Sequence, residues 1–223
     1  MRPIYFDYNA TTPLAPEVRA AMAPCGDSIW GNPSSVHQIG RQARAVLDES
    51  RYRLATAWNC RPSEVVFTSG GTEANNLAVF GTARALRHRG RHLITTPIEH
   101  HAVLHAIESL ARHEGFEVTW LPVDAAGQVD PDDVRRALRP DTVLVSVMAA
   151  NNEIGTCLPV AEIGTLCRER GVIFHTDAVQ AFGKLSFVDI HQFQADLVAV
   201  CAHKFHGPKG TGALFIRSPL QPQ

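Results

Sequence analysis

Residues 196–216 read Asp196-Leu197-Val198-Ala199-Val200-Cys201-Ala202-His203-Lys204-Phe205-His206-Gly207-Pro208-Lys209-Gly210-Thr211-Gly212-Ala213-Leu214-Phe215-Ile216. An apolar run delivers His203 and Lys204 into a turn rich in Gly and Pro, and a second apolar run leaves that turn. Lys204 is therefore expected where a strand ends, which is where α/β proteins keep their chemistry. A lysine held there can become a nucleophilic amine through desolvation, and the alternative is a solvated turn lysine.

Similar apolar runs recur through the rest of the chain. Strands are expected at residues 65–67, 92–95, 116–121, 143–148, 172–174, 197–201 and 213–216, with helical patterns between most of them. This alternation predicts an α/β fold with a mostly parallel seven-stranded sheet and helices on both faces. The last strand follows its neighbour after a turn too short for a parallel crossover, so it should be the one antiparallel strand.

Asp177 follows the short apolar run of residues 172–174. A carboxylate at such a strand end either caps a helix or contacts a ligand. Pyridoxal phosphate (PLP) is a ligand that needs this group, because a carboxylate beside the pyridine nitrogen keeps it protonated. Both readings stay open from the segment alone.

Three further polar segments come after predicted strands. Ser69-Gly70-Gly71-Thr72-Glu73 opens a helix and could bind a phosphate, although it is neither a Walker A nor a GxGxxG motif and could be only a helix start. His100 could stack on a cofactor or exchange protons, or be a surface histidine. Asn152 lies in what could equally be a plain polar turn.

Taken together, these segments resemble the cysteine desulfurases, PLP enzymes of the class V aminotransferase group. The resemblance runs in order through Phe6-Asp7-Tyr8-Asn9-Ala10-Thr11-Thr12-Pro13, Gly31-Asn32-Pro33-Ser34-Ser35, Thr68-Ser69-Gly70-Gly71-Thr72-Glu73-Ala74-Asn75-Asn76, Glu99-His100, Asn151-Asn152-Glu153-Ile154-Gly155, His175-Thr176-Asp177-Ala178-Val179-Gln180 and the Lys204 stretch. It implies a fold type I PLP-binding large domain. It also implies conversion of L-cysteine to L-alanine, with the sulfur passed to an enzyme cysteine for iron–sulfur cluster assembly or tRNA thiolation.

The resemblance also implies roles for individual residues. Lys204 and His100 would be catalytic, with His100 stacked on the cofactor ring. The implied cofactor-binding residues are Gly71, Thr72, His100, Asn152, Asp177, Gln180, Cys201, His203 and Lys204. Cys201 departs from the family, which usually has a serine donating to the phosphate there, and a thiol is the weaker donor.

Composition narrows the class of protein. The 223 residues are 45% hydrophobic, enough for a sizeable core, and the net charge of -1 offers no field for nucleic acid or an anionic membrane. No apolar run approaches spanning length and no signal peptide is visible, so a cytoplasmic location is expected. Five cysteines without paired spacing argue against disulfides and structural zinc. His101 and His105 could share a helix face, but they lack a third ligand, so no metal is expected.

The expected organisation has three parts. Residues 1–30 form an arm and a short helix with Pro16 at its first position, residues 31–217 form the PLP-binding domain, and residues 218–223 form a disordered tail. A long helix capped by Ser35 should run to about Trp58. The family's smaller C-terminal domain, with its sulfur-accepting cysteine and substrate-binding arginine, is expected to be absent, leaving this chain inactive alone.

Several functional readings remain open. By resemblance the protein is a homodimer that binds L-cysteine and a sulfur acceptor or iron–sulfur scaffold. The alternatives are a selenocysteine lyase or another class V aminotransferase, and a non-catalytic fragment that binds PLP or dimerises.

Overall fold

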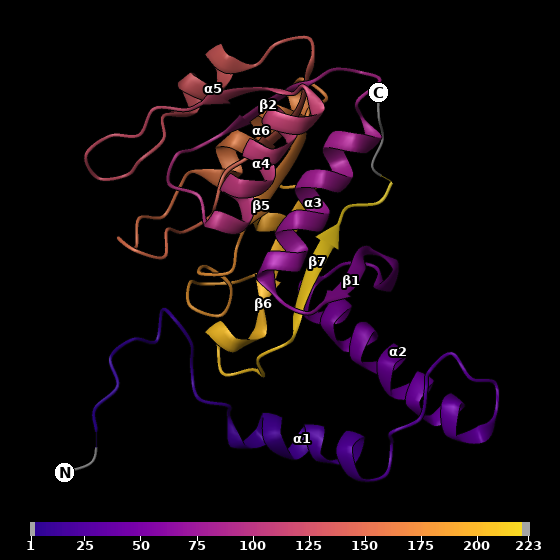
Figure 1. Cartoon of the computed structure of the whole chain (residues 1–223). Helices are drawn as coiled ribbons and strands as arrows, with labels where there is room; N and C mark the ends of the chain where they lie inside the picture. The colour runs from indigo at the N-terminus through magenta and orange to yellow at the C-terminus, as the bar shows by residue number, and fades with distance from the viewer. Residues whose placement is uncertain (1–2, 220–223) are drawn as a thin grey trace.

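A computed structural model describes residues 3–219 and contains one seven-stranded sheet (Figure 1). Its strands are β1 (Val65–Thr68), β2 (His92–Thr95), β3 (Glu117–Trp120), β4 (Thr142–Ser146), β5 (Ile173–Asp177), β6 (Leu197–Cys201) and β7 (Gly212–Ile216). Their order across the sheet is β1-β7-β6-β5-β4-β2-β3. Only β7 runs antiparallel to its neighbours, β1 and β6. The predicted mostly parallel sheet with one antiparallel strand is confirmed.

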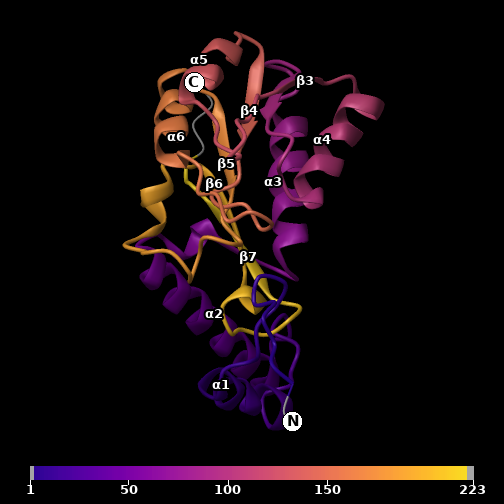
Figure 2. The ribbon, with the colours of Figure 1, turned by 90° about the vertical axis from the view of Figure 1, so that its left-hand side faces the viewer.

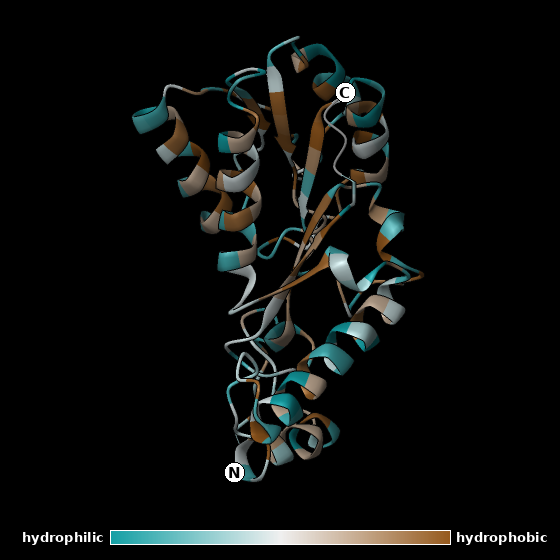
Figure 3. Cartoon of the chain, turned by 90° about the vertical axis from the view of Figure 1, so that its right-hand side faces the viewer, coloured by the Kyte–Doolittle hydropathy of each residue, from teal (hydrophilic) through white to brown (hydrophobic). Residues whose placement is uncertain are grey.

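Helices cover both faces of this sheet (Figure 2). One face packs against α2 (Gln38–Trp58), α5 (Pro131–Ala137) and α6 (Val160–Glu169), and the other packs against α3 (Gly71–Ala85) and α4 (His101–Glu114). Figure 3 shows that the strands are mostly hydrophobic, whereas the helices carry both kinds of residue. Strands such as β6 are buried along their whole length because helices exclude water from both sides.

The N-terminal arm and α1 (Pro16–Asp27) extend beyond the end of the sheet (Figure 1). Pro16 occupies a first-turn position, as predicted. None of the residues of α1 is buried in this chain.

The long helix α2 ends at Trp58, as predicted, but its expected cap was wrong. His37, not Ser35, precedes the first turn, and its ring nitrogen Nδ1 accepts a hydrogen bond of 3.3 Å from the Gly40 N–H group. Ser35 instead belongs to the preceding turn, where its N–H group donates to the carbonyl of Asn32.

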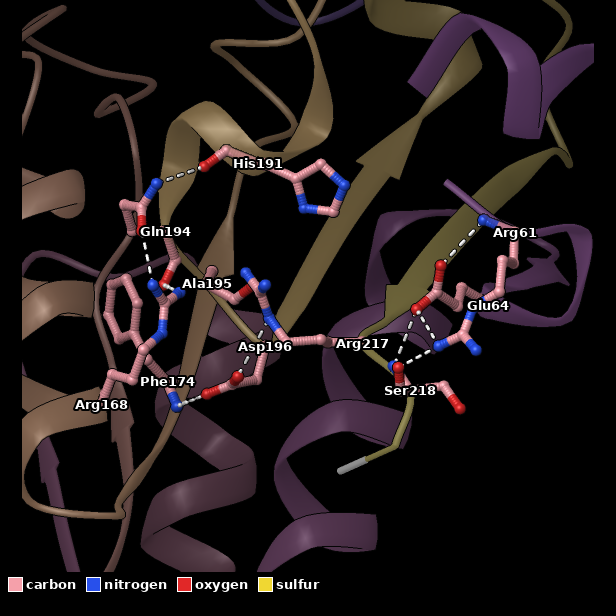
Figure 4. A network of polar contacts seen from close by, with 10 residues as sticks. All are labelled: Arg61, Glu64, Arg168, Phe174, His191, Gln194, Ala195, Asp196, Arg217 and Ser218. Atoms are coloured by element: carbon pink, nitrogen blue, oxygen red, sulfur yellow. Dashed lines mark hydrogen bonds and ion pairs between the residues drawn. The ribbon is translucent and has the colours of Figure 1, made fainter. Parts of the chain in front are cut away.

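A network of polar contacts stabilises the start of β6 and the end of β7, at the edge of the sheet opposite the Lys204 turn (Figure 4). Arg217 forms an ion pair with Asp196 at 3.3 Å, and the Ser218 N–H group donates to the Glu64 carboxylate at 2.8 Å. Burial alone would raise the pKa of Glu64, but hydrogen bonds from Arg61 and Ser218 bring the pKa below its ordinary value. Ser218 is therefore held in place, and residues 220–223 of the expected tail lie outside the described residues.

Among residues 3–219, no helix combines the length and the apolar character that crossing a membrane requires.

Candidate active site

A cavity of about 450 Å³ lies at the carboxyl ends of β5 and β6. All of the cofactor-binding and catalytic residues expected from the sequence line it: Gly71, Thr72, His100, Asn152, Asp177, Gln180, Cys201, His203 and Lys204. A larger hollow of about 860 Å³ lies beside the Arg217 network, and none of these nine residues lines it. The structure thus brings the whole predicted set together at one place.

Asp177 is the last residue of β5 and its carboxylate is buried. Oδ1 accepts a hydrogen bond of 2.9 Å from the Val179 N–H group, and Oδ2 accepts one of 2.6 Å from the Asn75 side chain. Burial raises the pKa of Asp177, while these two hydrogen bonds, His100 and Lys204 act in the opposite direction. A buried carboxylate at a cavity wall is suited to a cationic ligand atom.

Lys204 follows β6 at the end of a short 3₁₀ turn, Ala202–Lys204. Its ammonium nitrogen Nζ donates to the carbonyl oxygens of Asn9 at 2.7 Å and Ala10 at 3.0 Å. The N-terminal arm therefore reaches the amine that the sequence pattern indicated.

The start of α3 forms another wall of the cavity. Its N-cap residue is Gly70, which supplies no side-chain cap, so the first N–H groups of the helix are available to an anion. A side chain at Gly71 would meet Val179 Cγ2 at 2.8 Å, and the Cβ of Cys201 lies 3.5 Å from the same point. Cys201 is thus beside the helix start, although its thiol donates to the Thr211 carbonyl at 3.8 Å.

His100 caps α4 with its ring nitrogen Nδ1, which accepts a hydrogen bond of 3.1 Å from the Ala102 N–H group. In neutral imidazole the hydrogen must then be on Nε2, the nitrogen that remains for the cavity. The ring of His203 contacts the Thr11 hydroxyl at 3.1 Å. Asn152 lines the same cavity, and its side-chain amide donates to Glu153 at 2.5 Å.

Several residues that support this site had no role predicted from the sequence. Asn75 holds Asp177 from the first turns of α3, and Asn9 accepts from Lys204. Glu99 is buried, and its Oε1 accepts from the Thr96 hydroxyl at 2.9 Å and the Met148 N–H group at 2.8 Å. Its other oxygen has no partner among the described residues, and burial raises the pKa of Glu99 to about 8.

The histidine pair considered as metal ligands is present on α4. The ring centres of His101 and His105 lie 5.1 Å apart. Within residues 3–219, no group of three His, Cys, Asp or Glu side chains is placed to hold a metal ion.

These residues fit PLP. The uncapped start of α3 suits a phosphate, the buried Asp177 suits a protonated pyridine nitrogen, and Lys204 offers an amine to the aldehyde. The sheet order and the lysine and carboxylate at the ends of neighbouring strands define the fold type I class of PLP-dependent enzymes.

Comparison with known proteins agrees with this class. Residues 4–223 match the aminotransferase class-V family, and the chain belongs to that family. It is 51% identical over 219 residues to a protein named cysteine desulfurase IscS from Dictyoglomus turgidum, a match that covers 97% of this chain and 54% of the relative. The chain therefore spans about half the length of the curated relatives it matches.

Solved structures give the same result. One named "NIFS-LIKE PROTEIN" superposes with a TM-score of 0.92 at 39% identity, covering 97% of this chain and 59% of that one. Another, named "SspA in complex with cysteine", has a TM-score of 0.90 at 40% identity and covers 96% of this chain and 61% of that one.

Proposed function

We propose that this chain supplies the PLP-binding part of a cysteine desulfurase, which converts L-cysteine to L-alanine and passes the sulfur to a cysteine thiol. The observation that supports this most directly is the cavity shared by all nine residues, with Asp177 and Lys204 at the ends of adjacent parallel strands. The names of the relatives at about 50% identity support the same activity.

When bound, PLP supplies an electron sink that stabilises negative charge on the substrate carbon. Asp177 would hold the positive charge of the ring nitrogen, and the start of α3 would bind the phosphate. The Lys204 amine would anchor the cofactor and then move a proton at the substrate carbon. His100 would present its Nε2 hydrogen to the ring or substrate.

The choice of L-cysteine draws on two lines of support. The relatives are named for it, and one of the similar solved structures, that of SspA, is a complex with cysteine. Among the five cysteines here, only Cys201 lines the cavity, and it lies on the phosphate side. The thiol that accepts sulfur is therefore expected to come from outside residues 1–223.

Assembly is also part of the proposal. The arm and α1 expose Ile4, Phe6, Tyr8 and Met22, apolar side chains suited to burial against a second copy of the chain. This surface supports a homodimer, and sedimentation would test that part. The family resemblance is the support for a sulfur acceptor or an iron–sulfur scaffold as partner and for a cytoplasmic location, which cell fractionation would test.

The test uses purified protein and L-cysteine with added PLP. We expect residues 1–223 to bind PLP but to form no more alanine than free PLP does, and to gain activity when the C-terminal half of the Dictyoglomus turgidum relative is added. Multi-turnover alanine formation by residues 1–223 alone, lost in Lys204→Ala, would refute the need for an outside thiol.

Repeating the assay with L-selenocysteine, and measuring keto acids as well as alanine, separates the alternatives. Activity restricted to L-selenocysteine would indicate a selenocysteine lyase, and keto-acid formation would indicate an aminotransferase. PLP binding without any turnover in the supplemented protein would indicate a non-catalytic role.

A further inference from the structure

Lys184 lies close to the active site without lining its cavity. Lys184 is an exposed residue, yet its ammonium nitrogen Nζ donates to the side-chain oxygen Oε1 of Gln180 and, at 3.2 Å, to the side-chain oxygen of Asn9. An ammonium group can only donate hydrogen bonds, so the Gln180 atom that faces Lys184 must be the amide oxygen. Lys184 thereby favours the orientation of the Gln180 amide in which the oxygen faces Lys184 and the nitrogen faces away from it.

The other end of that amide is the donor. Nε2 of Gln180 donates to the main-chain oxygen of Asn9 at 2.9 Å, and Gln180 is a lining residue of the cavity. The same Asn9 oxygen accepts from Lys204 Nζ at 2.7 Å. Asn9 therefore joins the N-terminal arm to both lysines and to Gln180.

We propose that Lys184 is a positioning residue, which keeps the N–H₂ group of Gln180 directed at the cofactor cavity and holds the arm over that cavity through Asn9. Its part in cofactor binding rests on the proposed function, whereas its hold on the arm does not. Binding of PLP to Lys204 would remove the Lys204 contacts to Asn9 and Ala10, and the Lys184 contact would then keep Asn9 in place.

The electrostatic surroundings agree with this role. Burial of the ammonium group lowers the pKa of Lys184, and the nearby Lys204 lowers it further. Two neighbouring ammonium groups favour oxygen atoms near them, and Asn9 provides one to each, its side-chain oxygen to Lys184 and its main-chain oxygen to Lys204.

The chain contains three lysines, Lys184, Lys204 and Lys209. Because Lys204 belongs to the site itself, Lys209 is the matched control for Lys184. Lys209 is exposed in the turn after Lys204. Lys184→Met and Lys209→Met make the same chemical change and remove the same charge close to the site, but only the first removes a contact to Gln180 and Asn9.

The first measurement is hydrogen exchange in the protein without PLP. We expect Lys184→Met to accelerate exchange several-fold at the Ala10 and Thr12 amides, which are bonded to Asp7 and His203, and Lys209→Met to leave it unchanged. Equal exchange in the two variants would overturn the hold on the arm.

The second measurement is PLP titration of the protein. Loss of one hydrogen bond to an amide should weaken PLP binding by about fivefold in Lys184→Met, and Lys184→Arg should restore part of that loss. In a Gln180→Ala background, Lys184→Met should add almost nothing to the loss of PLP affinity, because the proposed effect of Lys184 on the cofactor runs through Gln180, whereas its hold on the arm is measured by hydrogen exchange.

Additive losses in the double variant, or equal affinity in Lys184→Met and Lys209→Met, would refute the orientation of Gln180. If the parent protein bound no PLP, the proposed function would fail instead, and the exchange measurement would still decide whether Lys184 holds the arm.

Discussion

Replacing Glu99 with glutamine should stabilise the protein at neutral and alkaline pH. Glu99 is buried with a pKa of about 8, caused first by burial and secondarily by the nearby Asp177. In the unfolded chain a glutamate has its ordinary value of 4.5. The folded protein therefore carries a protonated Glu99 at pH 7, whereas the unfolded chain carries an ionised one.

The sign follows from this difference. The folded pKa lies above the unfolded pKa, so stability from this group is complete below pH 4.5 and falls as the pH rises through about 8. Each pH unit in that window costs about 1.4 kcal/mol. Between pH 5 and pH 8, Glu99→Gln should gain on the order of 3 kcal/mol relative to the parent, because glutamine is neutral throughout.

Glutamine also keeps the contacts of the parent side chain. Its carbonyl oxygen can accept from the Thr96 hydroxyl and the Met148 N–H group as Oε1 does. The assay is urea unfolding from pH 5 to pH 8, with Glu108→Gln as the control because Glu108 is an exposed glutamate of α4. If the gain in the free energy of unfolding from Glu99→Gln changed with pH no more than that from Glu108→Gln, Glu99 would be ionised in the folded protein and the reasoning would be wrong.

Three further predictions concern the cofactor. Borohydride reduction with PLP should place a pyridoxyl group on Lys204, and peptide mapping that found it on Lys184 or Lys209 would contradict the assignment. In the protein supplemented with the C-terminal half of the Dictyoglomus turgidum relative, Asp177→Asn should slow exchange of the substrate α-proton by orders of magnitude, since loss of a buried charge partner costs on the order of 3–5 kcal/mol; unchanged deuterium exchange would exclude this role. Cys201→Ser should tighten PLP binding by about 0.5–1.5 kcal/mol because a hydroxyl is the stronger donor, and unchanged affinity would mean that this side chain stays with the Thr211 carbonyl.

Much of the fold could be predicted because the strands are short apolar runs between Gly, Pro and polar turns. The site followed from the same pattern, since the carboxyl ends of parallel strands meet at one edge of the sheet. The prediction for β5 stopped too early, at Phe174, because His175 and Thr176 are polar. In the structure His175 lies in the sheet and contacts the Ser146 hydroxyl at 2.8 Å, a pairing that local sequence does not reveal.

The supporting residues of the site could not be predicted for a related reason. Asn75 is an amide in the first turns of α3, Asn9 belongs to an irregular arm, and Lys184 is an exposed residue. Each acquires its role only through a partner at least four residues away, and up to 195 residues away for Asn9 and Lys204. Residue type and spacing carry no signal for such contacts.

The position of β7 has a consequence for biosynthesis. β1 has one neighbour in the sheet, β7, and Val65 is aligned with Phe215. During translation β1 has no strand to pair with until about 150 further residues, including β7, have left the ribosome. The nascent chain then carries two open strand edges, on β1 and β6, that only the arrival of β7 closes. During this interval the open edges can pair with other strands, and a chaperone that covers them would limit such mispairing.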